Sequence, residues 1–295
     1  MADAWLLFST NSIKTKTESG YIDTLLEKAR ENNINLEIKN IHKFSILSKD
    51  KNELYYDGKL VTELPKIAIT RRYEIYLTRQ LELMGVMVCN SPGPNCDARN
   101  KMKVHQLLAQ KGIKTPATVF SCFKNNYSNI SYENTCKMLG STKFVLKWLY
   151  GSQGKHVFLV DNKELFDKLV AKYKGRVLCQ EYIEESYGMD IRAYVINGKF
   201  LTAAIRKSSG NDFRSNLAQG GEALDVCCDE KLIKIAEDAA NAIGLDICGV
   251  DVLVGKDGYY ICEVNANPGF KCIGRVHGID EKDIFINLIK EKLNK

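Results

Sequence analysis

Short apolar runs and segments of helical periodicity alternate along the first ninety or so residues of the chain. Apolar side chains recur at Ile22, Leu25, Leu26 and Ala29, which predicts a helix at about 21–30. A second helix is expected at about 75–84, and strands are expected at 5–9, 35–40, 66–70 and 86–89. Strands that alternate with helices in this way predict a parallel sheet. The Pro/Gly cluster at 91–94 then marks a first domain boundary.

Beyond that boundary, the pattern favours antiparallel strand pairs. Asn197-Gly198 separates two apolar runs, and this dipeptide favours a type I′ turn between antiparallel strands. Asp229 can cap a helix that Gly244 ends. The expected helices lie at about 97–111, 162–173, 229–243 and 282–292, and the expected strands at 144–149, 155–160, 177–183, 191–196 and 199–205.

Composition and charge narrow the class of protein. The 295 residues are 45% hydrophobic and 26% charged, which is typical of a globular domain protein. The net charge of +6 suits an anionic ligand such as a nucleotide. No RNA- or DNA-binding module is visible, so nucleic acid is not expected as a partner. No apolar segment is long enough to span a membrane, and no secretory signal is recognisable.

The ten cysteines form neither a metal-binding nor a disulfide pattern. No CxxC spacing occurs, the four histidines are isolated, and a chain of this length does not need disulfides. Several cysteines fall inside apolar strands, where small buried side chains are the simplest interpretation. We therefore expect no zinc site and a cytoplasmic location.

Two carboxylates are brought together by the apolar pattern of 250–265. Val250, Val252 and Val254 would form one core face, and Tyr260, Cys262 and Val264 the other. Both faces lie on the same side of the sheet only if the connecting loop has an odd number of residues, which predicts the loop Lys256-Asp257-Gly258. Asp251 then faces Glu263, with Asn265 on the same side. Oxygen ligands of this kind suit Mg²⁺ or Mn²⁺; acids that simply face solvent are an equally good interpretation of the hairpin alone.

Three further segments carry chemistry only in combination. Lys147 precedes Gly151-Ser152-Gln153-Gly154, a loop whose backbone N–H groups could cover phosphates, although an ordinary hairpin explains it as well. Arg206 and Arg214 make the stretch around 206–216 cationic, which suits a phosphoryl group or a carboxylate, or else a surface loop. The strand end Gln180-Glu181-Tyr182-Ile183 could border an adenine or serve as a linker.

These segments occur in an order that resembles the ATP-grasp core of RimK-like α-L-glutamate ligases. The resemblance runs from about Asn90 onwards and rests on a set of short motifs. It implies an α/β chain with an N-terminal parallel domain at 1–93 and two α+β ATP-grasp subdomains with antiparallel sheets at 94–183 and 184–295. The motifs are Lys101, Val145-Leu146-Lys147, the glycine loop, Gln180–Ile183, Asp190-Ile191-Arg192, Asp212–Asn216, Gly249-Val250-Asp251 and Glu263–Gly269.

Roles follow from this resemblance residue by residue. Lys101 and Lys147 match phosphate-binding lysines, Glu181 and Tyr182 border the adenine, and Asp190 contacts the ribose. The phosphate-side loop corresponds to Arg214-Ser215-Asn216, while Arg192 and Arg206 match basic positions near the transferred group. Asp251, Glu263 and Asn265 match the metal ligands, which implies ATP with Mg²⁺ or Mn²⁺, in two sites, as cofactors.

The chemistry implied is amide formation from a carboxylate and an amine. ATP phosphorylates the carboxylate, and the amine displaces phosphate from the acylphosphate. The expected partners are an amino acid, such as glutamate, and a small acid, a peptide or a protein C-terminus. Ligation to an acidic carrier protein, as in lysine biosynthesis, and a nucleotide-binding regulator without catalysis are the alternatives. A dimer or tetramer would be usual for the resemblance.

The chain departs from the family pattern after Asn265. The glutamate ligases tend to carry a small serine and a Leu-Glu-Gly-like run where this chain has 266–275, so substrate choice is expected to differ there. In the N-terminal region, Arg71, Arg72 and Tyr73 follow a strand end, where open α/β sheets commonly bind ligands. They could engage the carboxylate substrate or form a solvated loop.

Overall fold

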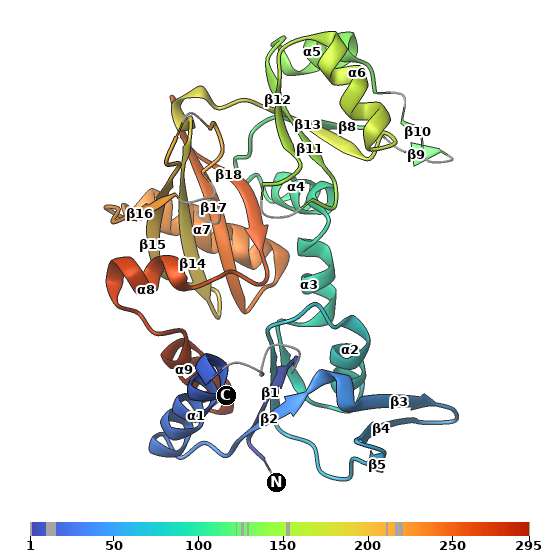
Figure 1. The fold of residues 1–295 in the computed structure, drawn as a ribbon, viewed down its shortest axis with the longest axis vertical. Helices are drawn as coiled ribbons and strands as arrows, with labels where there is room; N and C mark the ends of the chain where they lie inside the picture. Colours follow the sequence, from blue (N-terminus) through green and yellow to red (C-terminus); the bar gives the residue numbers. More distant parts are fainter. Residues whose placement is uncertain are drawn as a thin grey trace.

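A computed structural model describes residues 2–9, 16–121, 123–124, 127–128, 130–151, 154–210, 212–215 and 221–294 (Figure 1). It has the mixed α/β architecture expected from the sequence, with one parallel sheet and several antiparallel sheets. Within these ranges, no helix combines the length and the apolar character that crossing a membrane requires.

The first unit is the predicted parallel sheet, with strand order β2-β1-β6-β7. Alternate residues of β1 point to opposite faces: Leu6 packs in one core with Leu25, and Leu7 packs in another with Leu77 and Leu81. Helices therefore cover both faces. The elements are β1 (Ala4–Phe8), α1 (Lys16–Glu31), β2 (Leu36–Asn40), β6 (Ile67–Thr70), α2 (Ile75–Leu83) and β7 (Met87–Cys89).

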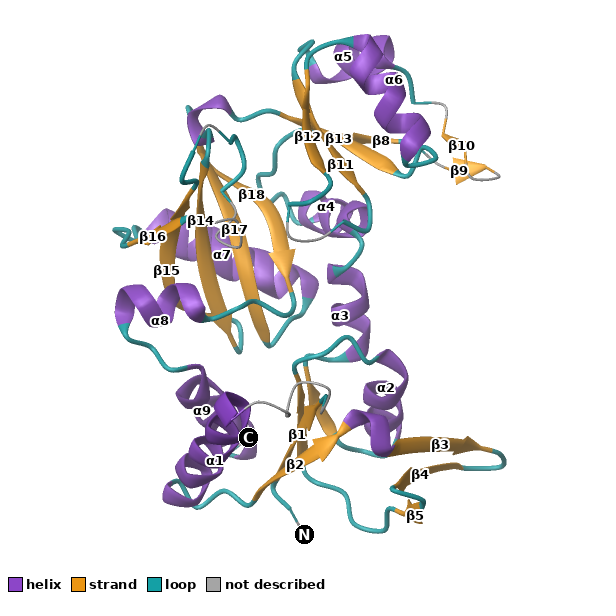
Figure 2. Cartoon of the chain, viewed as in Figure 1, coloured by secondary structure: helices purple, strands orange, loops and turns teal. Residues whose placement is uncertain are grey.

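An antiparallel arm that the pattern did not predict projects from this unit (Figure 2). It follows a 3₁₀ turn at Ile41–Lys43 and consists of β3 (Phe44–Ser48), β4 (Asn52–Tyr56) and β5 (Lys59–Leu60). The arm was missed because most of its side chains are partly or fully exposed, so their apolar content has no strong alternation.

The helix predicted at 97–111 is two helices in the structure. The first, α3 (Pro92–Ala98), begins with proline at its first position, where the missing N–H costs nothing. The second, α4 (Lys101–Gln110), restarts because the Asn100 side chain accepts hydrogen bonds from the N–H groups of Met102 and Lys103.

The central unit is an antiparallel sheet of order β12-β11-β13-β8. Two helices cover one face, with Phe144 and Phe166 in the shared core. Its elements are β8 (Thr118–Phe120), α5 (Tyr132–Leu139), β11 (Phe144–Trp148), β12 (Val157–Val160), α6 (Lys163–Lys172) and β13 (Val177–Glu181), with the short pair β9 (Phe123–Lys124) and β10 (Tyr127–Ser128) at one end.

The C-terminal unit is an antiparallel sheet of order β16-β15-β14-β17-β18, covered on one face by α7. Asp229 caps α7 and Gly244 ends it, as predicted. Asn197 and Gly198 both have positive φ, which confirms the predicted tight turn. The elements are a 3₁₀ turn at Glu184–Ser186, β14 (Met189–Ile196), β15 (Lys199–Lys207), β16 (Glu222–Leu224), α7 (Glu230–Ile243), β17 (Ile247–Gly255), β18 (Gly258–Asn265) and α8 (Lys271–His277).

The last helix, α9 (Glu281–Leu293), returns to the first unit and lies beside α1 (Figure 1). Ile284, Phe285 and Leu288 share a core with Leu6 and Ile69 of the parallel sheet. The range 184–295 expected for the third unit includes α9, but no pattern in the sequence predicted that this helix packs against the first unit.

Candidate active site

The hairpin of β17 and β18 pairs Asp251 with Glu263, as predicted, but by a different route. The turn has two residues rather than three, because Gly258 already pairs with Gly255. A β-bulge at Cys262 supplies the extra residue that returns Glu263 to the register of Asp251.

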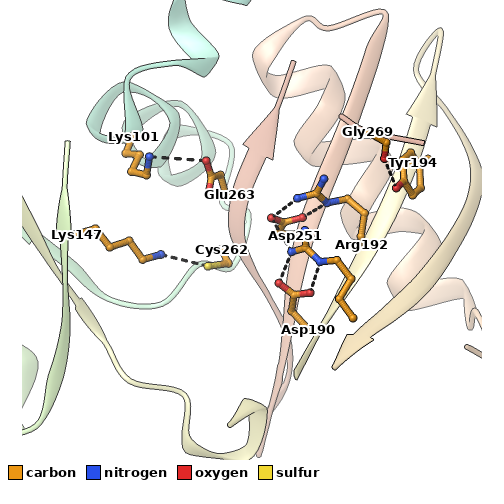
Figure 3. Close-up of polar contacts among 10 residues, drawn as sticks. Lys101, Lys147, Asp190, Arg192, Tyr194, Asp251, Cys262, Glu263 and Gly269 are labelled. Carbon is orange, nitrogen blue, oxygen red and sulfur yellow. Dashed lines mark hydrogen bonds and ion pairs between the residues drawn. The ribbon is translucent and has the colours of Figure 1, made fainter. Parts of the chain in front are cut away.

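The same bulge overturns part of the predicted core. Ile261 is buried beneath the sheet, and Val264 joins it there, but Tyr260 and Cys262 do not belong to that core. Cys262 faces a cavity on the other side, where its sulfur lies 3.2 Å from Lys147 Nζ (Figure 3). A single inserted residue therefore moves a thiol from the expected core into the site.

A buried cluster of charges lies on neighbouring strands of this sheet (Figure 3). Arg192 of β14 forms a two-pronged ion pair with Asp251, in which Nη2 lies 2.8 Å from Oδ2. Arg206 of β15 pairs with Asp190 and also lies 3.0 Å from Asp251. Burial alone would raise the pKa of Asp251, but the two guanidinium groups outweigh it and lower that pKa. Asp251 is therefore held as a carboxylate.

The side chain of Arg192 packs closely against the backbone of β17 at Gly249. A Cβ atom added to Gly249 would lie 2.8 Å from Arg192 Cδ and 2.9 Å from Pro268 Cβ. The close approach of Arg192 thus requires glycine at this position of β17.

Glu263 and Asn265 of β18 lie on the same side of the sheet as Asp251 of β17. The side chain of Glu263 is 39% exposed, and its carboxylate lies 3.7 Å from Lys101 Nζ. Asn265 Oδ1 accepts a hydrogen bond from the N–H of Asn267 at 2.9 Å. No cluster of three or more His, Cys, Asp or Glu side chains that could hold a metal occurs among the described residues. Two carboxylates and an amide oxygen are nevertheless donors of the kind that Mg²⁺ prefers, so the set fits such an ion.

The central unit contributes the opposite wall. Lys147 Nζ donates to Gln180 Oε1 at 2.6 Å, and Lys101 Nζ donates to the carbonyl oxygen of Gly151 at 2.5 Å. Arg214 pairs with Asp212 and donates from Nη1 to the carbonyl oxygen of Gly154 at 2.8 Å. Both ends of the glycine loop are therefore tied to cationic residues predicted to lie near phosphate. Ser152, Gln153 and Asn216, also predicted at the site, lie outside the described residues.

One cavity of about 1100 Å³ collects the predicted residues. It is bordered by all three units, including Arg71 and Tyr73 of the first. Every predicted site residue within the described part of the chain lines it, namely Lys101, Lys147, Gly151, Gly154, Gln180, Glu181, Tyr182, Ile183, Asp190, Arg192, Arg206, Arg214, Ser215, Asp251, Glu263 and Asn265.

Residues 98–289 match the family described as the RimK-like ATP-grasp domain. The chain is 31% identical over 276 residues to a probable alpha-L-glutamate ligase of Thioalkalivibrio sulfidiphilus, covering 90% of each chain.

The chain belongs to the RimK-like ATP-grasp family.

This ATP-grasp ligase is also similar to a second sequence relative and to solved structures. The chain is 33% identical to a probable alpha-L-glutamate ligase of Parasynechococcus marenigrum over 91% of its own length, but it spans only 59% of that relative. The ATP-grasp ligase PsnB, solved with a minimal precursor, has a TM-score of 0.72 at 17% identity, covering 99% of both chains. D-alanyl-alanine synthetase A of Vibrio cholerae has a TM-score of 0.67 at 14% identity, covering 99% of this chain and 98% of that one.

Several residues that line the cavity were given no individual role from the sequence, although Lys271 and Arg275 fall in the range 266–275 where substrate choice was expected to differ. Lys271 and Arg275 are exposed and one helical turn apart in α8, a spacing that the sequence contained. Glu281 lies 3.0 Å from Arg71, which also donates to the carbonyl oxygen of Pro268 at 3.1 Å. No sequence pattern predicted that Arg71 contacts Glu281 and Pro268, because these residues are about 200 positions apart in the chain and are brought together by the packing of α9 on the first unit. Arg72, predicted beside Arg71, does not line the cavity.

His105 of α4 gives this ATP-grasp ligase a measurable pH dependence of stability. Burial, aided by the charges of Lys147 and Lys101, lowers the pKa of His105 to about 3 from 6.5. Between these values the unfolded chain binds one more proton than the folded chain, so stability falls as the pH falls below about 6.5. His105→Gln should therefore lose about 1.5 kcal/mol less stability than wild type between pH 6.5 and pH 5, measured by urea unfolding. His42→Gln, at an exposed position, is the control; equal losses in His105→Gln and wild type would contradict the prediction.

Proposed function

We propose that this chain is an ADP-forming ligase that joins a carboxylate to the amine of an amino acid through an acylphosphate. The observation that carries the proposal is the shared cavity, in which Lys101 and Lys147 lie across from the β17–β18 hairpin that holds Asp251 and Glu263. Cations for phosphates and oxygen donors for a divalent metal thus open into one space.

The nucleotide would lie between the central and C-terminal units. Lys101 and Lys147 would bind its phosphates, and the loop that ends at Gly154 would cover them. Glu181, Tyr182 and Ile183, at the end of β13, would border the adenine. The carboxylate of Asp190 is engaged by Arg206 in the structure, so a contact with the ribose would compete with that ion pair.

Asp251, Glu263 and Asn265 would hold Mg²⁺ or Mn²⁺, in two sites shared with the phosphates. A bound ion of this kind supplies positive charge that stabilises the transferring phosphoryl group. Arg192 and Arg206 already neutralise Asp251, so an ion at Asp251 would share this carboxylate with guanidinium groups.

The chain's own residues would stabilise the negative charge of the reacting groups and keep water away from the acylphosphate. A carboxylate oxygen of the substrate forms a bond to the γ-phosphorus, and ADP leaves. The amine nitrogen then attacks the acyl carbon, loses a proton, and inorganic phosphate leaves. Arg192, Arg206 and Arg214 would stabilise the negative charge in both steps. The link from Arg214 to Gly154 would help the glycine loop to exclude water that could hydrolyse the acylphosphate.

The far side of the cavity favours anionic substrates. Arg71, Arg99, Lys271 and Arg275 line it, and the carboxylate of Glu281, which also lines it, is already paired with Arg71. Glutamate is the first amine to test, because the sequence relatives are named as probable alpha-L-glutamate ligases. A small acid, a peptide or a protein C-terminus could supply the carboxylate; PsnB has also been solved with the precursor peptide PsnA2.

The test is phosphate release from ATP and Mg²⁺ across a matrix of amino acids and carboxylic acids, with mass spectrometry of the products. An amide product that requires both an acid and an amine, and that is absent with Glu263→Ala, supports the proposal. Nucleotide binding without turnover on any pair would favour a protein carrier as substrate or a regulatory role. A chain that does not bind ATP would overturn it.

A further inference from the structure

Lys147 is a buried ammonium group with two of its N–H groups already committed. The residue is 7% exposed, and Nζ donates to Gln180 Oε1 at 2.6 Å and to Cys262 Sγ at 3.2 Å. An ammonium group has three N–H donors, so one remains for the cavity that Lys147 lines. Burial opposes the charge, but Cys262 and the nearby carboxylate of Glu263 outweigh it and raise the pKa of Lys147. The remaining donor therefore belongs to a charged group.

The direction of that donor depends on which way the amide of Gln180 faces. Gln180 is almost fully buried, and its Nε2 lies 3.0 Å from Thr118 Oγ1 and 3.0 Å from His105 Nε2. Thr118 donates its own hydroxyl hydrogen to the carbonyl oxygen of Pro116 at 2.9 Å, so it accepts from Gln180. In the opposite orientation, the NH₂ group of the Gln180 amide would face the Lys147 ammonium, and two groups that can only donate could not form a hydrogen bond.

His105 completes this arrangement from the helix that carries Lys101. The two residues are four apart in α4, so they lie on one face of the helix. The Gln180 Nε2 group can only donate hydrogen bonds, so His105 Nε2 must accept one from it. The proton of the neutral imidazole is therefore on Nδ1. Among the described residues, Nδ1 has no hydrogen-bond partner, so Gln180 is the polar group through which His105 acts.

We propose that His105 is a positioning residue: its neutral imidazole holds the Gln180 amide so that the amide oxygen aims Lys147 at a nucleotide phosphate. The inference rests on the proposed contact between Lys147 and phosphate. A buried hydrogen-bond chain thus runs from His105 of α4 through Gln180 of β13 to Lys147 of β11. Without an acceptor at position 105, Gln180 Nε2 keeps one unsatisfied hydrogen, and the preference for the productive amide orientation weakens.

The experiment compares binding of ADP and of adenosine to the full chain by NMR titration. Lys147→Met should weaken ADP binding and leave adenosine binding unchanged. His105→Leu should weaken ADP binding about tenfold, also without effect on adenosine. His105→Gln, which again offers an acceptor oxygen, should restore most of the lost affinity.

The controls separate this inference from the proposed function. If Lys147→Met binds ADP as wild type does, the phosphate contact is wrong and the inference falls with it. If Lys147→Met loses ADP but His105→Leu does not, or if His105→Leu weakens ADP and adenosine equally, the positioning role alone is overturned. Nitrogen NMR of the labelled histidine in wild type tests the same point without a variant: the proton should be on Nδ1, and a proton on Nε2 would contradict the proposal.

Discussion

Replacing Glu263 with glutamine is expected to lower kcat/KM for ATP by about a thousandfold or more, with little change in stability. The substitution removes one carboxylate of the proposed metal site, and about 4 kcal/mol of lost transition-state stabilisation corresponds to that factor. Glu263 is partly exposed, and its nearest cation, Lys101, is 3.7 Å away, so the fold should tolerate the change. Steady-state kinetics with saturating Mg²⁺ measures the effect.

Glu222→Gln is the matched control, because Glu222 is an exposed glutamate of the same sheet that does not line the cavity. It should retain wild-type kinetics. A Glu263→Gln enzyme with more than about a tenth of wild-type kcat/KM would remove Glu263 from the proposed metal site.

Arg206→Met is expected to destabilise the fold by about 3 kcal/mol or more, besides reducing activity. Arg206 is the ion-pair partner of Asp190 and the second partner of Asp251, and both carboxylates are buried. Removing one member of a buried charge network leaves an uncompensated charge, which commonly costs 3–5 kcal/mol, as an order of magnitude. Urea unfolding at neutral pH measures the loss.

Two further variants decide whether charge is the cause. Adding Asp190→Asn to Arg206→Met removes the stranded carboxylate and should recover a large part of the loss. Lys234→Met, which breaks an exposed ion pair with Asp238, should change stability by less than about 1 kcal/mol. If Arg206→Met were no more destabilising than Lys234→Met, the buried network would not have the energetic role assigned to it.

Local patterns in the sequence predicted the parts of the fold that depend on near neighbours. The alternation of strands and helices predicted the parallel sheet. Asn197-Gly198 predicted the tight turn between β14 and β15 of the C-terminal sheet, because both residues tolerate positive φ. The side of the sheet on which Asp251 and Glu263 meet also followed from the pattern, although the loop length was wrong. The bulge at Cys262 could not be inferred, because the alternation of apolar residues allowed either route to the same register.

The rest of the site depends on contacts between residues far apart in the chain. Arg192 and Asp251 are 59 positions apart, and only the register of β14 against β17 makes them partners. The chain from His105 to Lys147 crosses three elements, and its two side-chain hydrogen bonds join residues 75 and 33 positions apart. A family resemblance named Lys147, but only the fold shows what orients it.

The most direct test of the proposed chemistry follows one oxygen atom. An acid that proves to be a substrate in the screen of amino acids and carboxylic acids is labelled with ¹⁸O at both oxygens of its carboxylate. It is then incubated with the enzyme, ATP, Mg²⁺ and the amine. An acylphosphate pathway transfers one labelled oxygen to phosphorus, so each inorganic phosphate released with the amide should carry one ¹⁸O from the doubly labelled acid. Amide formation with unlabelled phosphate, or with AMP and pyrophosphate as products, would contradict the proposed ligase mechanism.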